Sequence, residues 1–356
     1  MIKRCCAIFW LVFPLAALLN CQRVRTDSQS SEIQTPLSVE REWQLLTAES
    51  GGKLQDGCMP RRIEAQGTRK GVVFLLHGFT ACPQQFDKLA EKLSQQGYEV
   101  FLPLLPGHGY EPKELSPRLD HSDLLPSTLG GYTPMFERIY RIAEALPGRK
   151  IIGGLSLGAT LATLAVVERP QLFDAELALV PPFLFSSQFV SLLTAPVDFP
   201  ITVMLNEVRW ADMELSWGSL CWNEEAERGR AGYCKFKVSH VTGVQKLSEY
   251  VLQKVKSLVS SGKEIKTEFQ FIGGTEDPVI SNPTMYSVVE LLRQRTKVSL
   301  CMYRGGGHSL LSVYDRPFDK PWLGSLLKGS VEFIGQRKNF AAAADTFEAQ
   351  PICKVP

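Results

Sequence analysis

The pentapeptide Gly154-Leu155-Ser156-Leu157-Gly158 contains the side chain in this sequence that is best placed to attack an electrophile. The apolar run before it predicts a strand, and the small residues after it predict the first turn of a helix. A tight turn between the two would hold the serine in a strained conformation above a sheet, and glycine at each flank would avoid a collision with neighbouring backbone. The alternative is an ordinary strand-to-helix turn without chemistry.

Two histidines follow Ser156, and a serine hydroxyl needs such a base before it becomes a good nucleophile. His308 stands in a glycine loop directly after the last predicted strand, so we expect this residue to reach the serine. We interpret His240, at the edge of an irregular region, as a surface or cap residue. A carboxylate must orient the imidazole and stabilise its protonated form. Asp277 is the expected acid, because it lies in the turn after a preceding strand, and Glu276 is the alternative.

An attacked carbonyl develops negative charge on its oxygen, which backbone N–H groups must stabilise. The N–H of Leu157 would lie at a helix N-terminus, whose dipole favours an anion. The second donor is predicted to be the N–H of Phe79, in the loop after the first predicted strand. We interpret His77 and His108 as residues that brace loops by hydrogen bonding, and we assign no role to His121.

These residues lie in a region where strand-like and helix-like patterns alternate, which predicts a parallel sheet with helices on both faces. We expect strands at residues 71–76, 98–105, 150–155, 174–180, 267–272 and 297–303, and helices at 83–96, 135–146, 156–168, 244–259, 282–295 and 323–335. The alternation stops at residues 183–240, which are rich in Phe and Trp and which we interpret as an inserted cap.

Residues 74–109, with the sequence FLLHGFTACPQQFDKLAEKLSQQGYEVFLPLLPGHG, resemble the opening of bacterial carboxylesterases and monoacylglycerol-lipase-like hydrolases. With GLSLG, GGTEDPV and GGGH, the resemblance covers residues 70–340. It implies the α/β-hydrolase fold and cofactor-free ester hydrolysis through an acyl-enzyme. In that fold the order along the chain is serine, acid, histidine. The resemblance therefore assigns Ser156, Asp277 and His308 as the catalytic triad, and Phe79 and Leu157 as the oxyanion hole.

The substrate is less well defined by the sequence than the reaction. Ala81 stands where the family often has Gly, and the cap at 183–240 matches no family pattern. The aromatic residues of the cap favour an apolar acyl group, such as a short or medium ester or a monoacylglycerol. Two alternatives stay open, because a fold and a triad do not fix the substrate. One is the same triad acting on an amide, on a thioester or in acyl transfer, and the other is a lipid-anchored binding protein without turnover.

The N-terminal segment has the layout of an export signal: Lys3 and Arg4 precede an apolar stretch that ends at Leu19. Asn20-Cys21 resembles the end of a bacterial lipoprotein signal, so we expect a signal peptide at 1–20, a lipid on Cys21 and a membrane-anchored protein on the periplasmic or cell-surface face. Cleavage without lipidation and a retained transmembrane helix are the alternatives. Residues 21–40 are then predicted to be a polar tether, 41–340 the hydrolase domain with its cap, and 341–356 a C-terminal tail.

Charge and cysteine content narrow the range of partners. The 39 Lys and Arg residues nearly balance 37 Asp and Glu, without long runs of like charge, so nucleic acid is not an expected partner. Six cysteines would remain after export and lipidation, which permits disulfides. Cys221–Cys234 is the predicted pair, and the other four cannot be paired from sequence. No cysteine spacing matches a zinc site, so we predict no metal.

Overall fold

The computed structural model describes residues 36–48, 53–111, 124–194, 214–216, 229–336, 340 and 351–354. The predicted signal peptide, the lipidation site at Cys21, His121 and much of the predicted cap lie outside the described residues. Of the helices within these ranges, none is both long and apolar enough to cross a membrane.

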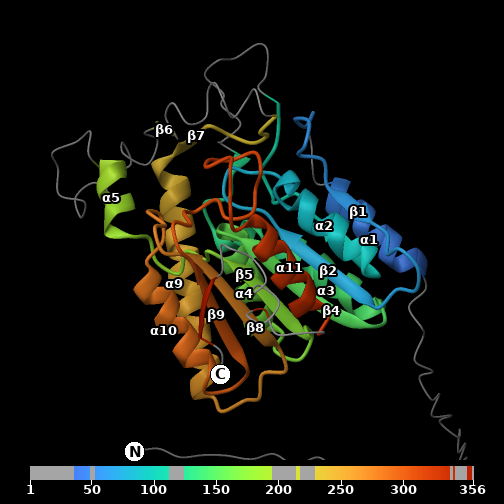
Figure 1. The fold of residues 1–356 in the computed structure, drawn as a ribbon. Helices are drawn as coiled ribbons and strands as arrows, with labels where there is room; N and C mark the ends of the chain where they lie inside the picture. The colour runs from blue at the N-terminus through green and yellow to red at the C-terminus, as the bar shows by residue number, and fades with distance from the viewer. Residues whose placement is uncertain are drawn as a thin grey trace, which may run out of the picture. The chain divides into compact units, whose positions relative to one another are not determined.

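An eight-stranded sheet lies at the centre of the structure, in the order β1-β3-β2-β4-β5-β8-β9-β10 (Figure 1). The inner strands pair in parallel, and the edge strands β1 and β10 pair antiparallel to their neighbours. Every strand predicted from the sequence is present. The strands are β1 (Arg61–Ile63), β2 (Gly71–Leu76), β3 (Tyr98–Leu102), β4 (Arg149–Leu155), β5 (Ala175–Leu179), β8 (Glu268–Gly274), β9 (Val298–Tyr303) and β10 (Ile352–Lys354).

Helices cover both faces of the sheet, as the alternating pattern predicts (Figure 1). Helix α2 packs with α11 on one face, while α4 packs with α9, and α9 with α10, on the other. The strands β2 and β5 are buried along their whole length, which explains their unbroken apolar sequences. The helices are α1 (Pro36–Ala48), α2 (Asp87–Gln95), α3 (Thr133–Ala145), α4 (Leu157–Glu168), α5 (Ser187–Thr194), α9 (Val238–Ser260), α10 (Asn282–Leu292) and α11 (Leu323–Ile334), with 3-10 turns η1 (Pro83–Phe86) and η3 (Leu129–Gly131).

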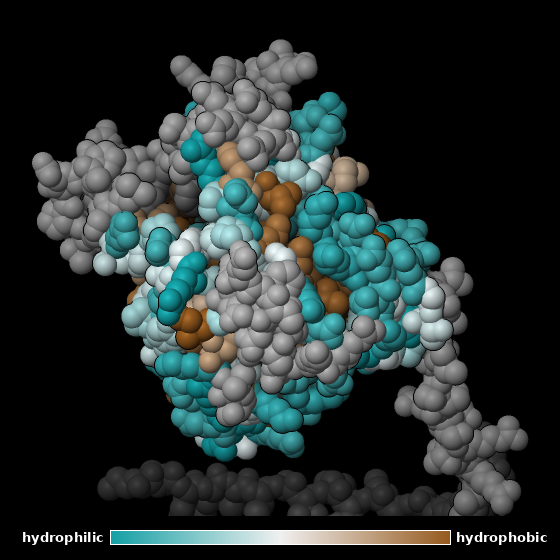
Figure 2. Space-filling model, in the orientation of Figure 1, coloured by the Kyte–Doolittle hydropathy of each residue, from teal (hydrophilic) through white to brown (hydrophobic). Residues whose placement is uncertain are grey.

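On the face shown in Figure 2, hydrophobic side chains form a narrow stripe over α11 and the loop before it. The surface beside this stripe is largely hydrophilic. Within the predicted cap, the described residues form α5 and a two-stranded sheet of β6 (Glu214–Ser216) and β7 (Lys235–Lys237).

The sequence predicts a polar tether at residues 21–40. Helix α1 begins at Pro36 and so overlaps the end of that segment. Val39, Trp43 and Leu46 are all buried, at the i, i+4 and i+7 positions of one helical face. The Trp43 ring meets Phe101 edge-on, with 5.3 Å between ring centroids. Tertiary packing of this face, rather than a strong local pattern, holds the helix on the sheet.

Two disulfides join segments that the sequence left unpaired: Cys58–Cys82 and Cys301–Cys353. The second attaches β10, part of the predicted tail, to β9, where the two cysteines lie opposite each other. Closing loops of 24 and 52 residues, each bond would contribute about 3 to 4 kcal/mol to stability. Cys234 is disulfide-bonded, but Cys221 lies outside the described residues, so the Cys221–Cys234 pair stays a prediction.

Candidate active site

Ser156 occupies a sharp turn between β4 and α4, with φ 54° and ψ −120°. A non-glycine residue rarely adopts this backbone conformation, and such strain is characteristic of functional sites. The flanking glycines make the turn possible. A Cβ atom on Gly154 would lie 2.1 Å from the carbonyl carbon of Gly158, and one on Gly158 would lie 1.9 Å from the carbonyl oxygen of Leu76. Helix α4 can therefore approach β2 and β4 only without side chains at these two positions.

His308 joins Ser156 and Asp277 in a continuous hydrogen-bonded chain. Its Nε2 lies 2.8 Å from the Ser156 Oγ, and its Nδ1 lies 2.8 Å from the Asp277 Oδ2. The other carboxylate oxygen of Asp277 accepts hydrogen bonds from the backbone N–H groups of Val279 at 2.8 Å and Ile280 at 3.3 Å. The Asp277 side chain is fully buried, whereas 22% of the His308 side chain is exposed. The carboxylate is thus fixed, and the imidazole is open to a small reactant.

The sheet explains why these three residues meet. Asp277 follows β8 and His308 follows β9, and these neighbouring parallel strands end at the same edge of the sheet as β4. The two loops are in close contact, because a Cβ on Gly274 would lie 1.9 Å from the carbonyl oxygen of Gly306. Glu276, the alternative acid, is exposed, and its backbone N–H donates to the same oxygen.

His240, the other histidine after the serine, is buried in the first turn of α9. Its Nδ1 accepts a hydrogen bond from the backbone N–H of Lys237, at 3.0 Å. This contact satisfies one of the free donors at the start of the helix. The prediction of a cap residue agrees with this position, although the side chain is not on the surface.

The predicted oxyanion donors come from the residue directly after the serine and from the loop after β2. Leu157 is the first residue of α4, where backbone N–H groups have no partner within the helix. Among the hydrogen bonds of the described residues, none uses the backbone N–H of Leu157 or Phe79. Gly78, the residue before Phe79, is held through both of its backbone groups: its N–H donates to the Gln85 Oε1 at 2.9 Å, and its C=O contacts the His77 Nδ1 at 2.9 Å.

His77 and His108 brace loops, as predicted. The His77 Nε2 accepts a hydrogen bond from the backbone N–H of Leu105 at 2.9 Å, and the His108 Nδ1 contacts the Pro106 carbonyl at 2.9 Å. Burial lowers the pKa of His77 well below its ordinary value and lowers the pKa of His108 to about 4. Both imidazoles are therefore neutral near pH 7. A neutral His77 can accept through Nε2 while donating through Nδ1.

An aromatic cluster lies against the loops that carry Phe79 and Asp277. Phe79 meets Phe236 of β7 edge-on, with 5.3 Å between ring centroids. The ring centroids of Phe185 and of Phe189 in α5 are 5.0 Å apart. Val279, two residues after the candidate acid, packs into the same cluster. Part of the predicted cap thus forms an apolar wall beside the site. In the described part of the chain, no group of three or more His, Cys, Asp or Glu side chains is placed to hold a metal ion.

The chain belongs to the family described as serine aminopeptidase, S33, whose family model matches residues 67–313. It is similar to a thermostable monoacylglycerol lipase of Bacillus sp. (strain H-257), with 33% identity over 100 residues. That match covers 28% of this chain and only 36% of the relative, so the chain aligns with about a third of that protein's length.

Two solved structures show the same fold at low sequence identity. A monoacylglycerol lipase of Paleococcus ferrophilus matches with a TM-score of 0.56 and 19% identity over 78% of this chain and 98% of that one. A soluble variant of monoglyceride lipase from Saccharomyces cerevisiae, in complex with a substrate analog, matches with a TM-score of 0.57 and 14% identity over 79% of this chain and 92% of that one. The predicted α/β-hydrolase fold is confirmed.

Proposed function

We propose that this chain is a serine hydrolase that cleaves carboxylic esters through an acyl-enzyme. The hydrogen-bonded chain from Asp277 through His308 to Ser156 is the observation that carries the proposal. Ser156, on its strained strand-to-helix turn, supplies the nucleophile, His308 supplies the base, and Asp277 supplies the orienting carboxylate. The similarity to a monoacylglycerol lipase supports an ester as the substrate.

The proposed reaction begins with attack of the Ser156 Oγ on the ester carbonyl. The Nε2 of His308 accepts the hydroxyl proton, and Asp277 stabilises the resulting imidazolium through Nδ1. The negative charge on the former carbonyl oxygen is met by the N–H groups of Phe79 and Leu157. His308 then gives its proton to the departing alcohol. A water molecule hydrolyses the acyl-enzyme by the same route, with His308 again as the base.

We propose that the acyl group is apolar and of short or medium length, as in a simple ester or a monoacylglycerol. The wall formed by Phe79, Phe185, Phe189 and Phe236 supports this choice, because aromatic side chains favour contact with hydrocarbon over water. The triad itself requires neither a metal nor a cofactor.

A substrate profile tests the proposal. Purified protein should hydrolyse p-nitrophenyl esters and monoacylglycerols, fastest with short or medium acyl chains. Ser156→Ala should lower the rate by at least about 10⁴-fold. Ser287→Ala, which removes an exposed hydroxyl on α10, is the matched control and should leave the rate unchanged. Absence of turnover with every ester would argue against an esterase.

Amide hydrolysis is the second candidate function, because the matching family model is described as a serine aminopeptidase. Amino-acid p-nitroanilides in the same assay separate the two candidates. If they are cleaved faster than the esters at equal concentration, the scissile bond is an amide.

We also propose that the chain is exported and anchored to a bacterial membrane through a lipid on Cys21. The layout of residues 1–21 supports this, and so do the disulfides Cys58–Cys82 and Cys301–Cys353, because such bonds persist in oxidising compartments. If Cys21→Ala leaves the protein in the membrane fraction, the lipid anchor is excluded.

A further inference from the structure

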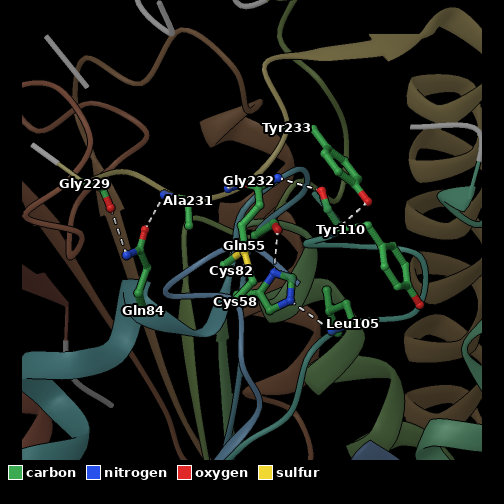
Figure 3. The surroundings of a disulfide bond; sticks show 12 residues. Gln55, Cys58, Cys82, Gln84, Leu105, Tyr110, Gly229, Ala231, Gly232 and Tyr233 are labelled. Carbon is green, nitrogen blue, oxygen red and sulfur yellow. Dashed lines mark hydrogen bonds between the residues drawn. A yellow bond between two sulfur atoms is a disulfide. The ribbon is translucent and has the colours of Figure 1, made fainter. Parts of the chain in front are cut away.

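Residues 229–233, here called the return segment, lie within the predicted cap just before β7 and contact the loop that carries Phe79. The backbone N–H of Tyr233 donates to the carbonyl oxygen of Thr80 at 2.7 Å. Gly232 has a φ of 124°, and a Cβ there would lie 2.1 Å from that oxygen. The contact is therefore between backbone and backbone. The return segment of the cap thus packs against the predicted oxyanion loop, next to the Cys58–Cys82 disulfide (Figure 3).

Gln84 holds the return segment on both sides of Arg230. Its amide Nε2 donates to the carbonyl oxygen of Gly229 at 3.1 Å, and its Oε1 accepts from the N–H of Ala231 at 2.5 Å (Figure 3). Both backbone neighbours of Arg230 are thus attached to one side chain, which fixes where the guanidinium can reach.

The guanidinium of Arg230 reaches a buried carboxylate. Its Nε donates to the Asp315 Oδ1 at 2.8 Å, and the Gln85 Nε2 donates to the Asp315 Oδ2 at 3.1 Å. Burial alone would raise the pKa of Asp315. The charge of Arg230 and the hydrogen bonds from Gln85 and Ser312 outweigh burial and hold that pKa below its ordinary value. Asp315 is therefore an anion, and it belongs to the loop that follows His308.

The charge of Asp315 determines which way the Gln85 amide points. An ionised carboxylate only accepts hydrogen bonds, so the NH₂ group of Gln85 must face it. The carbonyl oxygen of the same amide then faces the backbone N–H of Gly78, where it accepts a hydrogen bond at 2.9 Å. All three groups are buried, so water cannot substitute for a lost partner at low cost.

The peptide between Gly78 and Phe79 carries the donor N–H. The carbonyl oxygen of Gly78 contacts the His77 Nδ1 at 2.9 Å and accepts from the N–H of Ala81 at 3.2 Å. Because this C=O and the Phe79 N–H belong to one planar trans peptide, they point in opposite directions. The Gly78 N–H that Gln85 holds belongs to the preceding peptide, between His77 and Gly78. With both peptides held, Gly78 has little freedom to rotate, and the direction of the donor is fixed.

We propose that Asp315 is a positioning residue for the Phe79 oxyanion donor, acting through Gln85 and Gly78, and that Arg230 connects this donor to the cap. The proposal rests on the hydrolase function argued above. It gives a role to a carboxylate that does not touch the reacting atoms. The contacts close a ring, from Gln84 to the return segment, through Arg230 and Asp315, and back to Gln85.

Two rates test this role: kcat for a p-nitrophenyl ester and the rate constant for labelling by a fluorophosphonate, which needs the same donors but no ester substrate. Asp315→Asn keeps the size of the side chain and should lower both rates by about 10- to 100-fold, with KM changed little, because a transition-state contact is lost. Gln85→Met should cause a similar loss, and the double variant should lose no more than either single variant. Arg230→Met should cause a smaller loss in the same direction.

Glu99→Gln is the matched control. Glu99 is also a buried carboxylate with charged partners, Arg62 at 2.6 Å and Arg69 at 2.8 Å, but it lies on β3 away from the site. This variant should lower the melting temperature without changing either rate.

The outcomes separate the two proposals. If folded Asp315→Asn keeps wild-type rates, or if its losses add to those of Gln85→Met, the positioning role is wrong. The role is also wrong if Glu99→Gln loses as much rate as Asp315→Asn. A wild-type protein that is labelled but cleaves no ester overturns the proposed substrate class, while the labelling rates still decide the role of Asp315.

Discussion

Glu176 is a buried carboxyl group that the proposed chemistry does not use. It lies in β5, and its Oε1 accepts a hydrogen bond from the Thr163 hydroxyl at 2.6 Å. Its Oε2 is buried without a partner among the described residues. Burial raises the pKa of Glu176 to about 8 from an ordinary value of 4.5, and the bond from Thr163 offsets only part of this. Below both values the folded and unfolded chains are equally protonated.

Between these two pKa values, stability falls as the pH rises. The unfolded chain releases a proton that the folded chain keeps, so the free energy of unfolding decreases. We predict that Glu176→Gln removes this decrease. From about pH 5 to about pH 8, the unfolding free energy of the variant relative to wild type should rise by roughly 4 kcal/mol. Urea unfolding of both proteins at several pH values measures this difference in unfolding free energy.

His77 and His108 have lowered pKa values in the folded chain, so they make stability rise with pH. Wild type and Glu176→Gln share this contribution, which therefore cancels in the difference between their unfolding free energies. A difference that stays constant with pH would mean that Glu176 has an ordinary pKa in the folded chain.

At the scale of elements, the approach of α4 to β2 is the feature on which the serine turn depends. We predict that Gly158→Ala lowers the melting temperature and abolishes ester hydrolysis, because its Cβ would lie 1.9 Å from the Leu76 carbonyl oxygen and must push the helix away. Overpacking of this kind costs about 1 to 3 kcal/mol or more. Gly130→Ala is the control, since its Cβ would meet only the Thr128 Oγ1, at 3.8 Å. Equal melting temperatures for the two variants would refute the argument.

The inner elements could be predicted because local pattern and burial agree there. The strand at Gly71–Leu76 is apolar along its whole length and buried along its whole length. The edge strands lacked such a signal: β1 and β10 have three residues each and are partly exposed. Helix α1 also escaped prediction, since its stability comes from the contact of Trp43 with Phe101, far away in sequence.

At the scale of the whole molecule, chain order placed the candidate triad. Asp277, between Ser156 and His308, could be predicted because parallel strands bring their carboxyl ends to one edge. The side chains that hold the oxyanion loop could not be predicted. Gln85 and Asp315 are 230 residues apart, and although Gln85 lies in the stretch that resembles the family, the local sequence of neither residue indicates that the two side chains meet. The pairing of Cys58 with Cys82 was equally out of reach, since it depends on how two loops fold over each other.

The central claim is that the Ser156 hydroxyl is an activated nucleophile. The most direct test is to treat the protein with a fluorophosphonate and locate the adduct by mass spectrometry of its peptides. We predict a single adduct on Ser156, no labelling of Ser156→Ala, and very slow labelling of His308→Ala. Folded wild-type protein that is not labelled, or an adduct on another serine, would contradict the claim.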